Sequence, residues 1–319
     1  MRPIAIGVLL LGCAVPAFPI VIQSVGAPGY VTGNNNFTGV VAIYFQQGSG
    51  TYICSGALFS GGADILTAGH CVAGSSNFEV VFFTPSGETV VGVSQSYLDP
   101  LWGTRPGDTS GSLPPQYDVG VLKLAGLPPA DAARYGLDTT GNDVYLDSTL
   151  VDLVGYGIGG SPATGSDDYG VGTRRHAVNT VAGTICGFGG TNCQNTPVPT
   201  PDDPIELLLN LGESYQGSNT PCFNNSACGL PNAGDSGGPL LVGNNILGVT
   251  SFGNLPRPGP PDYSPVAYPA GTYVAGYTNL TNPQIASWVD SFLVPDPSTW
   301  LLMLLGCAGL LVRSKFVND

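Results

Sequence analysis

Short apolar runs, separated by glycine, proline and asparagine, recur along most of this 319-residue chain. A turn at 33–36 leads into the first two runs, which together predict a hairpin. The abundant valine, threonine and tyrosine, with 47 glycines and 28 prolines, suit short strands and turns more than helices. The pattern therefore predicts an all-β fold. The strand-like runs are residues 40–45, 52–59, 78–83, 89–97, 118–124, 151–157 and 245–253.

One segment near the end of the chain has the period of a helix instead. Asn282 is placed to cap its start, and Pro283 suits the first helical position. Four apolar residues then share one face. They are Ile285, Trp288, Val289 and Phe292. We expect a helix over 282–293.

Both ends of the chain carry apolar segments outside the strand pattern. Residues 1–19 are typical of a secretory signal, with a basic residue, an apolar run at 4–15 and small residues before the expected cut. The tetrapeptide that ends at Cys13 only loosely resembles a lipidation motif. The other run, 301–312, is shorter than the ~20 residues that a membrane span needs. We therefore expect an exported protein.

The charge balance excludes one class of partner. The formal net charge is −13, from 9 Lys and Arg against 22 Asp and Glu. Binding to nucleic acid requires clusters of Lys and Arg that neutralise phosphates, so no nucleic-acid partner is expected. The acidic balance fits a solvated exterior, and the length allows one large domain or two modest ones.

The cysteines fit an oxidising compartment. Two of the eight lie in the terminal apolar segments, which leaves six in the body of the chain. Six cysteines in an exported protein predict three disulfides. The sequence does not fix how the last four of them pair, although local pairing would join Cys186 to Cys193 and Cys222 to Cys228.

Candidate chemistry centres on the segment 231–240, which reads Pro-Asn-Ala-Gly-Asp-Ser-Gly-Gly-Pro-Leu. The hydroxyl of Ser236 becomes a useful nucleophile only if a base takes its proton and donors stabilise the oxyanion. Of the two histidines, His70 ends an apolar run, whereas His176 is expected to be an ordinary surface or strand residue. Asp118 opens a strand-like segment, where a buried carboxylate can orient a histidine ring.

Together these segments resemble the signature blocks of the chymotrypsin/trypsin-like serine proteases. Thr-Ala-Gly-His-Cys, Asp-Val-Gly-Val-Leu-Lys-Leu and Gly-Asp-Ser-Gly-Gly-Pro-Leu occur in the order of that family. The resemblance implies His70 as the base, Asp118 as the residue that orients it and Ser236 as the nucleophile. It also implies an oxyanion hole made by the backbone N–H groups of Gly234 and Ser236. No cofactor and no metal ion is expected.

The same resemblance implies a fold for residues 24–293: two antiparallel β-barrels with the active site in the cleft between them. A disulfide between Cys54 and Cys71 would staple the loop that carries the histidine. The expected parts are barrels at 24–135 and 145–281, closed by the helix at 282–293.

In this family the specificity pocket is set by the residue six positions before the serine, here Leu230. Because an apolar residue offers no negative charge, we expect a preference for an apolar or aromatic side chain rather than for Lys or Arg. Gly253 and Gly271 align with the glycines that leave the mouth of the pocket open. Ser251 and Phe252 lie on the segment that resembles the substrate-binding strand.

Activation does not follow the usual route of the family, in which cleavage after a basic residue frees an N-terminus that pairs with the aspartate beside the serine. That aspartate is Asp235 here, and no Lys or Arg lies between Arg2 and Arg105. Ile20 would become the new end only if a peptidase cut after Pro19. The partner of Asp235 is therefore left open.

The tail, residues 294–319, resembles a PEP-CTERM sorting signal. Pro-Asp-Pro and Trp300 precede the apolar run, and Arg313 and Lys315 follow it, with Asp296 where glutamate is usual. The resemblance implies processing by a signal peptidase and an exosortase-like enzyme, and transient or lasting anchoring at the cell surface. The other expected partners are protein or peptide substrates. The protein itself is expected to be a monomer.

Three alternatives compete with peptide-bond hydrolysis through an acyl-enzyme. The serine segment also fits the G-x-S-x-G elbow of α/β-hydrolases, but their histidine follows the serine, and no histidine follows Ser236. A catalytically silent binding or matrix protein on the same scaffold stays open. So does a surface-anchored protein that acts through its Gly/Pro loops.

Overall fold

The computed structural model describes residues 20–22, 30–59, 61–103, 117–139, 149–161, 165–166, 170–184, 205–210, 228–256 and 272–293. The expected signal segment 1–19 and tail 294–319 lie outside these ranges. Among the described residues, no helix has the length and apolar character needed to cross a membrane. Individual residues of the sequence predictions that also fall outside the ranges are Cys186, Cys193, Cys222 and Gly271.

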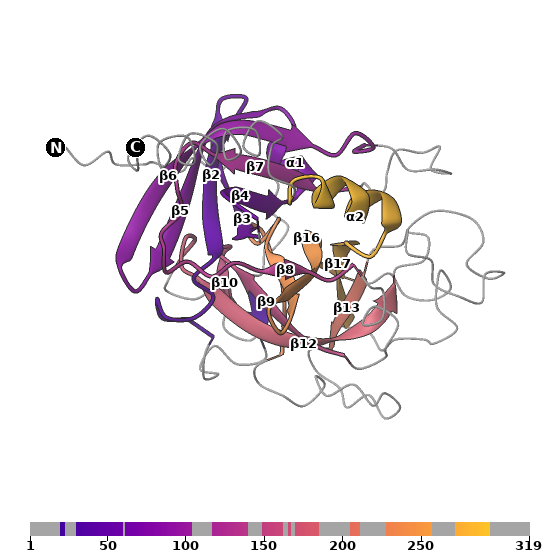
Figure 1. The fold of residues 1–319 in the computed structure, drawn as a ribbon. Coiled ribbons are helices and arrows are strands. Elements are labelled where there is room, and N and C mark those ends of the chain that lie inside the picture. Colours follow the sequence, from indigo (N-terminus) through magenta and orange to yellow (C-terminus); the bar gives the residue numbers. More distant parts are fainter. Residues whose placement is uncertain are drawn as a thin grey trace, which may run out of the picture.

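Six antiparallel strands close the first barrel, drawn in indigo to purple in Figure 1. They pair in the order β2-β3-β4-β7-β6-β5. The β2–β3 hairpin turns over two residues, and Gly48 has a φ of 59° there, which glycine adopts without strain. The strands are β2 (Val40–Gln47), β3 (Gly50–Leu58), β4 (Asp64–Thr67), β5 (Ser75–Thr84), β6 (Gly87–Leu98) and β7 (Gly120–Leu124). Each contributes apolar side chains to one core, among them Ile43, Leu58, Ile65, Phe82, Val91 and Leu122.

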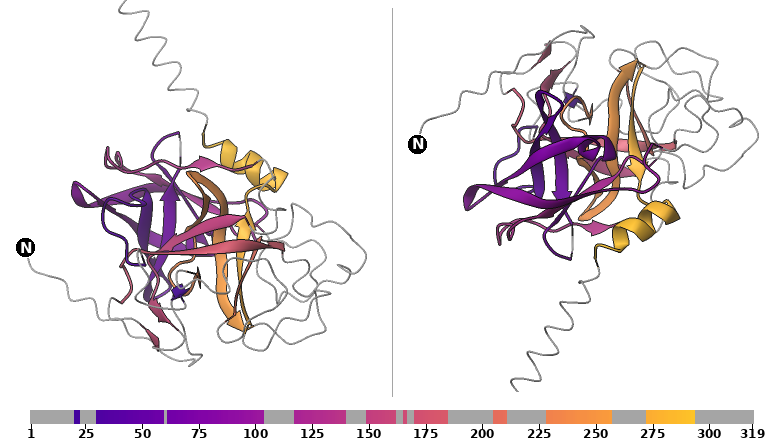
Figure 2. Two further views of the ribbon diagram at one scale, coloured as in Figure 1. Left: turned by 90° about the horizontal axis from the view of Figure 1, so that it is seen from below. Right: turned by 90° about the horizontal axis from the view of Figure 1, so that it is seen from above.

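The second sheet also closes on itself, because β15 pairs with both β9 and β16. The closed series is β15-β9-β12-β13-β17-β16, and β8 (Gly136–Leu137) adds to β16 in parallel. Its strands are β9 (Leu150–Gly155), β12 (Arg175–Thr184), β13 (Ile205–Asn210), β15 (Pro239–Val242), β16 (Asn245–Pro256) and β17 (Thr272–Asn279). The two barrels lie side by side in both views of Figure 2. The all-β, two-barrel fold predicted from the sequence is confirmed.

A small third sheet ties the first described residues to the second barrel. β1 (Ile20–Ile22) lies between β10 (Gly159–Ser161) and β14 (Gly229–Leu230), and β11 (Gly165–Ser166) completes the sheet. Ile20 is buried, and its N–H donates to the carbonyl of Ile158 at 3.0 Å. The strand next to β1 therefore leads directly into the segment that carries Ser236.

The helix α2 (Pro283–Asp290) covers one side of the first barrel, as Figure 1 shows in yellow. The side chain of Asn282 accepts hydrogen bonds from the N–H groups of Gln284 and Ile285, which caps the helix start as the sequence predicts. Ile285 and Val289 are buried in the first-barrel core. The observed helix is shorter than the expected 282–293, because the chain turns after Asp290.

Polar contacts from the second barrel fix the two barrels relative to each other. Tyr156, just after β9, donates its hydroxyl to the carbonyl of Val40 on β2 at 2.9 Å. Arg174, just before β12, is buried and donates to the carbonyls of Phe83 at 2.9 Å and Gly33 at 2.8 Å. These bonds satisfy buried groups that would otherwise be costly to leave unpaired, so they hold one docking geometry.

Candidate active site

His70 and Asp118 lie at neighbouring ends of two paired strands. His70 is in the short helix α1 (Gly69–Val72) after β4, and Asp118 lies just before β7, the antiparallel neighbour of β4. The carboxylate accepts a hydrogen bond from the His70 backbone N–H at 2.8 Å, and its other oxygen lies 2.7 Å from Nδ1. Because an ionised carboxylate can only accept, Nδ1 carries the proton and Nε2 presents a lone pair.

Two second-barrel side chains hold Asp118 from the other side. The hydroxyl of Ser251 on β16 donates to Asp118 Oδ2 at 2.6 Å, and that of Thr278 on β17 donates to the Asp118 carbonyl at 2.8 Å. Asp118 is only 1% exposed. From the sequence, Ser251 is expected on the strand that binds the substrate backbone. Its bond to Asp118 could not be predicted, because no motif spacing links two residues 133 positions apart.

The protonation of His70 is governed by two opposing influences. Burial, the larger single influence, lowers the pKa of the imidazole, but the hydrogen bond and charge of Asp118 together outweigh it. The pKa of His70 is therefore raised above its ordinary 6.5. The side chain keeps 38% of its surface exposed, so the ring stays accessible.

Ser236 lies in a tight turn between β14 and β15. Gly234 and Gly237 on either side have φ values of 93° and 81°, in the left-handed region that glycine tolerates. Ser55 on β3 fastens the turn, donating its backbone N–H to the Ser236 carbonyl at 2.7 Å and its hydroxyl to the Gly234 carbonyl at 2.9 Å. The position of Ser236 is thus set against the first barrel.

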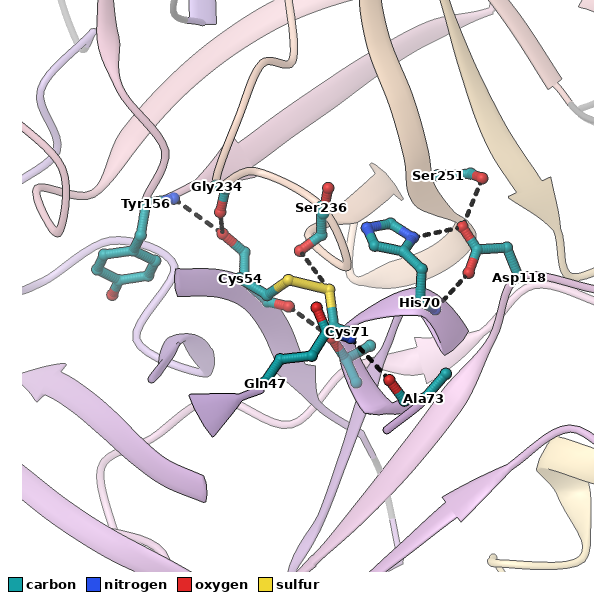
Figure 3. The surroundings of a disulfide bond; sticks show 12 residues. Gln47, Cys54, His70, Cys71, Ala73, Asp118, Tyr156, Gly234, Ser236 and Ser251 are labelled. Carbon is teal, nitrogen blue, oxygen red and sulfur yellow. Dashed lines mark hydrogen bonds and ion pairs between the residues drawn. A yellow bond between two sulfur atoms is a disulfide. The ribbon is translucent and has the colours of Figure 1, made fainter. Parts of the chain in front are cut away.

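The three residues are brought together at one place in the fold. In Figure 3 the ring of His70 lies between Ser236 and the carboxylate of Asp118. Cys71 Sγ lies 3.8 Å from the Ser236 carbonyl oxygen and within 4.8 Å of a His70 ring nitrogen. A base, a buried carboxylate and a hydroxyl from distant parts of the sequence are therefore neighbours.

The backbone around Ser236 leaves two N–H groups available. Asp235, Gly237 and Gly238 donate theirs to the carbonyls of Asn232, Thr250 and Asp235 respectively. Gly234 and Ser236 donate to no group in the part of the chain that the structure describes. Two N–H groups of this kind, on either side of Asp235, suit an oxygen atom that gains negative charge during a reaction.

Comparison with known proteins agrees with this geometry. The sequence profile of the family described as Trypsin matches residues 28–277. The chain belongs to the trypsin family. Similar solved structures include HL collagenase, with 18% identity, a TM-score of 0.54 and coverage of 83% of this chain and 96% of that one. Neuropsin, a serine protease expressed in the limbic system of mouse brain, has 18% identity, a TM-score of 0.51 and coverage of 84% and 99%.

A third similar structure, GrC, has 17% identity, a TM-score of 0.51 and coverage of 83% of this chain and 97% of its own. No curated protein sequence matches this chain. At such low identities the structures support the fold of this trypsin-family chain and nothing finer.

In this trypsin-family chain the carboxylate of Asp235, next to Ser236, is completely buried. It accepts hydrogen bonds from the N–H groups of Gly157 at 2.8 Å and Asn232 at 2.9 Å. Burial raises the pKa of the carboxyl group to about 7, although these two bonds and the positive charge of Arg175 act in the opposite direction. The sequence did not identify the partners of Asp235. In the structure they include the backbone N–H groups of Gly157 and Asn232.

The described residues of the expected specificity pocket lie on two segments, 230–231 and 251–253. Leu230 is fully buried in the core of the second barrel, and Ser251 begins the segment that continues through Phe252. Gly253 lies against the carbonyl of Pro231, so that a methyl group added to Gly253 would overlap it. The two segments therefore approach each other closely at this point.

The disulfide between Cys54 and Cys71 is present, with Cα atoms 6.4 Å apart. These two cysteines and His70 form a cluster of potential metal ligands, but sulfur atoms in a disulfide offer no thiolate to a metal ion. Cys228 is also disulfide-bonded. The other cysteines of the two expected pairs, Cys186–Cys193 and Cys222–Cys228, lie outside the described residues.

The second histidine lies away from this site. His176 on β12 pairs with Asp152 on β9 at 2.6 Å, and its ring lies against that of Phe37 at 4.9 Å. This placement on a strand agrees with the expectation of an ordinary histidine.

Proposed function

We propose that this trypsin-family serine protease is an endopeptidase that works through an acyl-enzyme on Ser236. His70 Nε2 takes the proton of the Ser236 hydroxyl as its oxygen attacks the substrate carbonyl. Asp118 fixes the ring and stabilises the imidazolium that forms. The observation that supports these roles best is the 2.7 Å contact between Asp118 and His70 Nδ1, which leaves Nε2 as the base on the Ser236 side.

The tetrahedral intermediate requires donors for its oxyanion. The N–H groups of Gly234 and Ser236 would supply them, which gives these two residues the oxyanion-hole role. His70 then gives its proton to the leaving amine, and the acyl-enzyme forms. Water, activated by the same imidazole, releases the second product and restores the Ser236 hydroxyl.

The substrate residue before the cleaved bond would be small and apolar. Leu230 offers no charge for a cation, which supports the preference predicted from the sequence. The close approach of Gly253 to the Pro231 carbonyl supports a small pocket, in which alanine would fit better than a wide aromatic ring. Phe252, between Ser251 and Gly253, would face the substrate backbone.

The protein would act outside the cytoplasm. The Cys54–Cys71 disulfide supports export to an oxidising compartment, since such bonds are rare in the cytosol. The signal-like segment 1–19 and the PEP-CTERM-like tail 294–319 support cleavage by a signal peptidase and sorting by an exosortase-like enzyme. Mass spectrometry of the protein recovered outside the cell tests both cuts, and a mature chain that keeps both segments would contradict them.

Labelling with a fluorophosphonate tests the catalytic assignment. The reagent bonds covalently to an activated serine, so wild-type protein should label and Ser236→Ala should not. His70→Ala should slow labelling by about 10⁴-fold, because the base is lost. Wild-type protein that stays unlabelled while correctly folded would instead support a silent binding or matrix protein on this scaffold.

A further inference from the structure

The loop that holds the two oxyanion donors is supported from beneath by a buried carboxylate. Asp235 lies between Gly234 and Ser236 in the chain, so the position of its side chain fixes the peptide group that carries the Ser236 N–H. The Gly234 N–H belongs to the preceding peptide group, that of Ala233 and Gly234. The carboxylate oxygens of Asp235 are held by the N–H groups of Gly157 and Asn232. Because Asn232 belongs to the same loop, Gly157 is the anchor that comes from elsewhere.

The segment that contains Gly157 fits closely around this carboxylate. A Cβ on Gly157 would lie 2.6 Å from the carbonyl oxygen of Ala233 and 2.8 Å from the backbone nitrogen of Asp235. A Cβ on Gly155 would overlap the carboxylate itself. The next residue, Ile158, donates its N–H to the Ala233 carbonyl at 3.1 Å. The catalytic loop is therefore packed tightly against residues 155–158.

Arg175 holds this segment from the far side. Its side chain is fully buried, and the guanidinium donates to the carbonyls of Gly157 at 2.8 Å and Thr173 at 2.9 Å. A third bond goes to the carbonyl of Gly170, also at 2.8 Å. Gly157 thus receives a bond from Arg175 at its carbonyl and gives one to Asp235 from its N–H.

A buried arginine is expensive unless its charge and its donors are satisfied, so its presence calls for a reason. Three carbonyls satisfy donors of Arg175, and the charge also acts on Asp235, whose carboxylate it favours. Lysine could not replace this arrangement, because only the planar guanidinium reaches several carbonyls in a fixed fork.

We propose that Arg175 is a positioning residue for catalysis. Through Gly157 it fixes Asp235 and thereby the Ser236 N–H, and through the adjoining Ile158 it fixes the Ala233–Gly234 peptide group, which carries the other oxyanion donor. This role rests on the proposed protease function. It does not depend on which residue begins the mature chain, since Arg175 is internal to the second barrel.

The chain offers a matched control in the preceding residue. Arg174 is also buried, and it donates to the carbonyls of Gly33 and Phe83 and to the hydroxyl of Tyr156. Among the residues that the structure describes, it makes no bond to Gly157 or to Asp235. Replacing either arginine by methionine removes a buried charge and several hydrogen bonds. Only the change at Arg175 removes the support of the catalytic loop.

The experiment compares the mature wild-type protein with Arg175→Met, Arg175→Lys and Arg174→Met. Unfolding temperatures are measured first, and kcat and KM are then measured well below them with a tetrapeptide p-nitroanilide ending in alanine. We expect kcat to fall about 100-fold in Arg175→Met and about 10-fold in Arg175→Lys, with KM changed by less than about 3-fold. In Arg174→Met the bond to Gly157 is kept while barrel docking is weakened, so kcat should fall at least about 10-fold less than in Arg175→Met, despite a lower unfolding temperature.

An Arg175→Met enzyme with kcat within about 3-fold of wild type would overturn the proposal, and so would an equal loss in Arg174→Met. If Arg175→Met is not secreted, an unchanged kcat in Arg175→Lys overturns it. Different results would contradict the protease function and the proposed role of Arg175. A folded wild type that a fluorophosphonate does not label contradicts the protease function itself, whereas a labelled wild type with unaffected variants contradicts only the role of Arg175.

Discussion

The hydroxyl of Ser251 donates a 2.6 Å hydrogen bond to the carboxylate of Asp118, across the boundary between the two barrels. The same carboxylate oxygen faces His70 Nδ1 at 2.7 Å. One atom of Asp118 thus joins the histidine of the first barrel to a strand of the second. The alignment of the proposed base therefore depends on correct docking of both barrels.

Replacing Ser251 with alanine should weaken this alignment without removing any reacting group. The buried carboxylate loses a donor that is worth about 1.5–3 kcal/mol, and the ring of His70 gains freedom. We expect kcat to fall about 10-fold with little change in KM. Steady-state kinetics on the alanine p-nitroanilide measures this, and a variant with unchanged kcat would show that the bond is dispensable.

The raised pKa of His70 predicts the pH dependence of both activity and stability. The base must be neutral, so kcat/KM should rise with pH through a value above 6.5. Folding favours the protonated ring, and this stabilisation is complete below the unfolded pKa and is lost as pH rises through the folded one. Urea unfolding of wild type should therefore show a free energy of unfolding that declines across this range.

The variant Asp118→Asn is the control for the pH dependence that the raised pKa of His70 predicts. Without the carboxylate, burial alone acts on the ring, so the pKa of His70 should fall and the part of the pH dependence that His70 contributes should disappear. The contribution of Asp235, whose pKa is raised to about 7, should remain. Activity should fall by about 10⁴-fold, because the amide no longer enforces the Nδ1–H tautomer. A variant whose stability keeps the wild-type pH dependence would assign that dependence to another group.

Substrate choice should follow from the close approach of Gly253 to Pro231, which leaves room for only a small side chain in the proposed pocket. In a panel of p-nitroanilides that differ only in the last residue, alanine should exceed phenylalanine by at least about 10-fold in kcat/KM. Lysine and arginine should be poor, since Leu230 carries no charge. A strong preference for phenylalanine would show that these two segments separate on binding, and a preference for lysine or arginine would refute the apolar pocket.

Gly157 should be intolerant of any side chain. The added methyl of Gly157→Ala would meet the Ala233 carbonyl and Asp235, so we expect a loss of about 1–3 kcal/mol in the free energy of unfolding. Gly92 on β6 is the matched control, because nothing lies within 4 Å of a Cβ built there. Denaturant titration of both variants measures the free energy of unfolding. Equal values for Gly157→Ala and Gly92→Ala would indicate that the backbone around Asp235 shifts easily to make room for the methyl group.

The features that the sequence predicted correctly are those that depend on residues close together in the chain. The alternation of short apolar runs with turns was enough for an all-β fold, and Asn282 with Pro283 was enough for the start of α2. The segments around His70, Asp118 and Ser236 are continuous motifs, so their positions could be read without tertiary information. The structure places all three side by side.

Features that depend on contacts between distant segments could not be predicted. Nothing in the local sequence shows that Arg174 and Arg175 are buried, since charged residues usually lie on the surface. The need for glycine at 155 and 157 comes from a carboxylate almost 80 residues away. The bond from Ser251 to Asp118 has the same origin. The pairing of β1 with β14 was also missed, because a three-residue strand carries no periodic signal.

That pairing gives the beginning of the described chain an unexpected place. Val21 lies opposite Leu230, only six residues before Ser236, and Ile20 is buried against Ile158. An affinity tag or fusion partner joined immediately before Ile20 would have to emerge beside the catalytic loop. Recombinant enzyme for kinetic work is therefore better tagged at the opposite end, and the choice of start residue becomes an experimental variable in its own right.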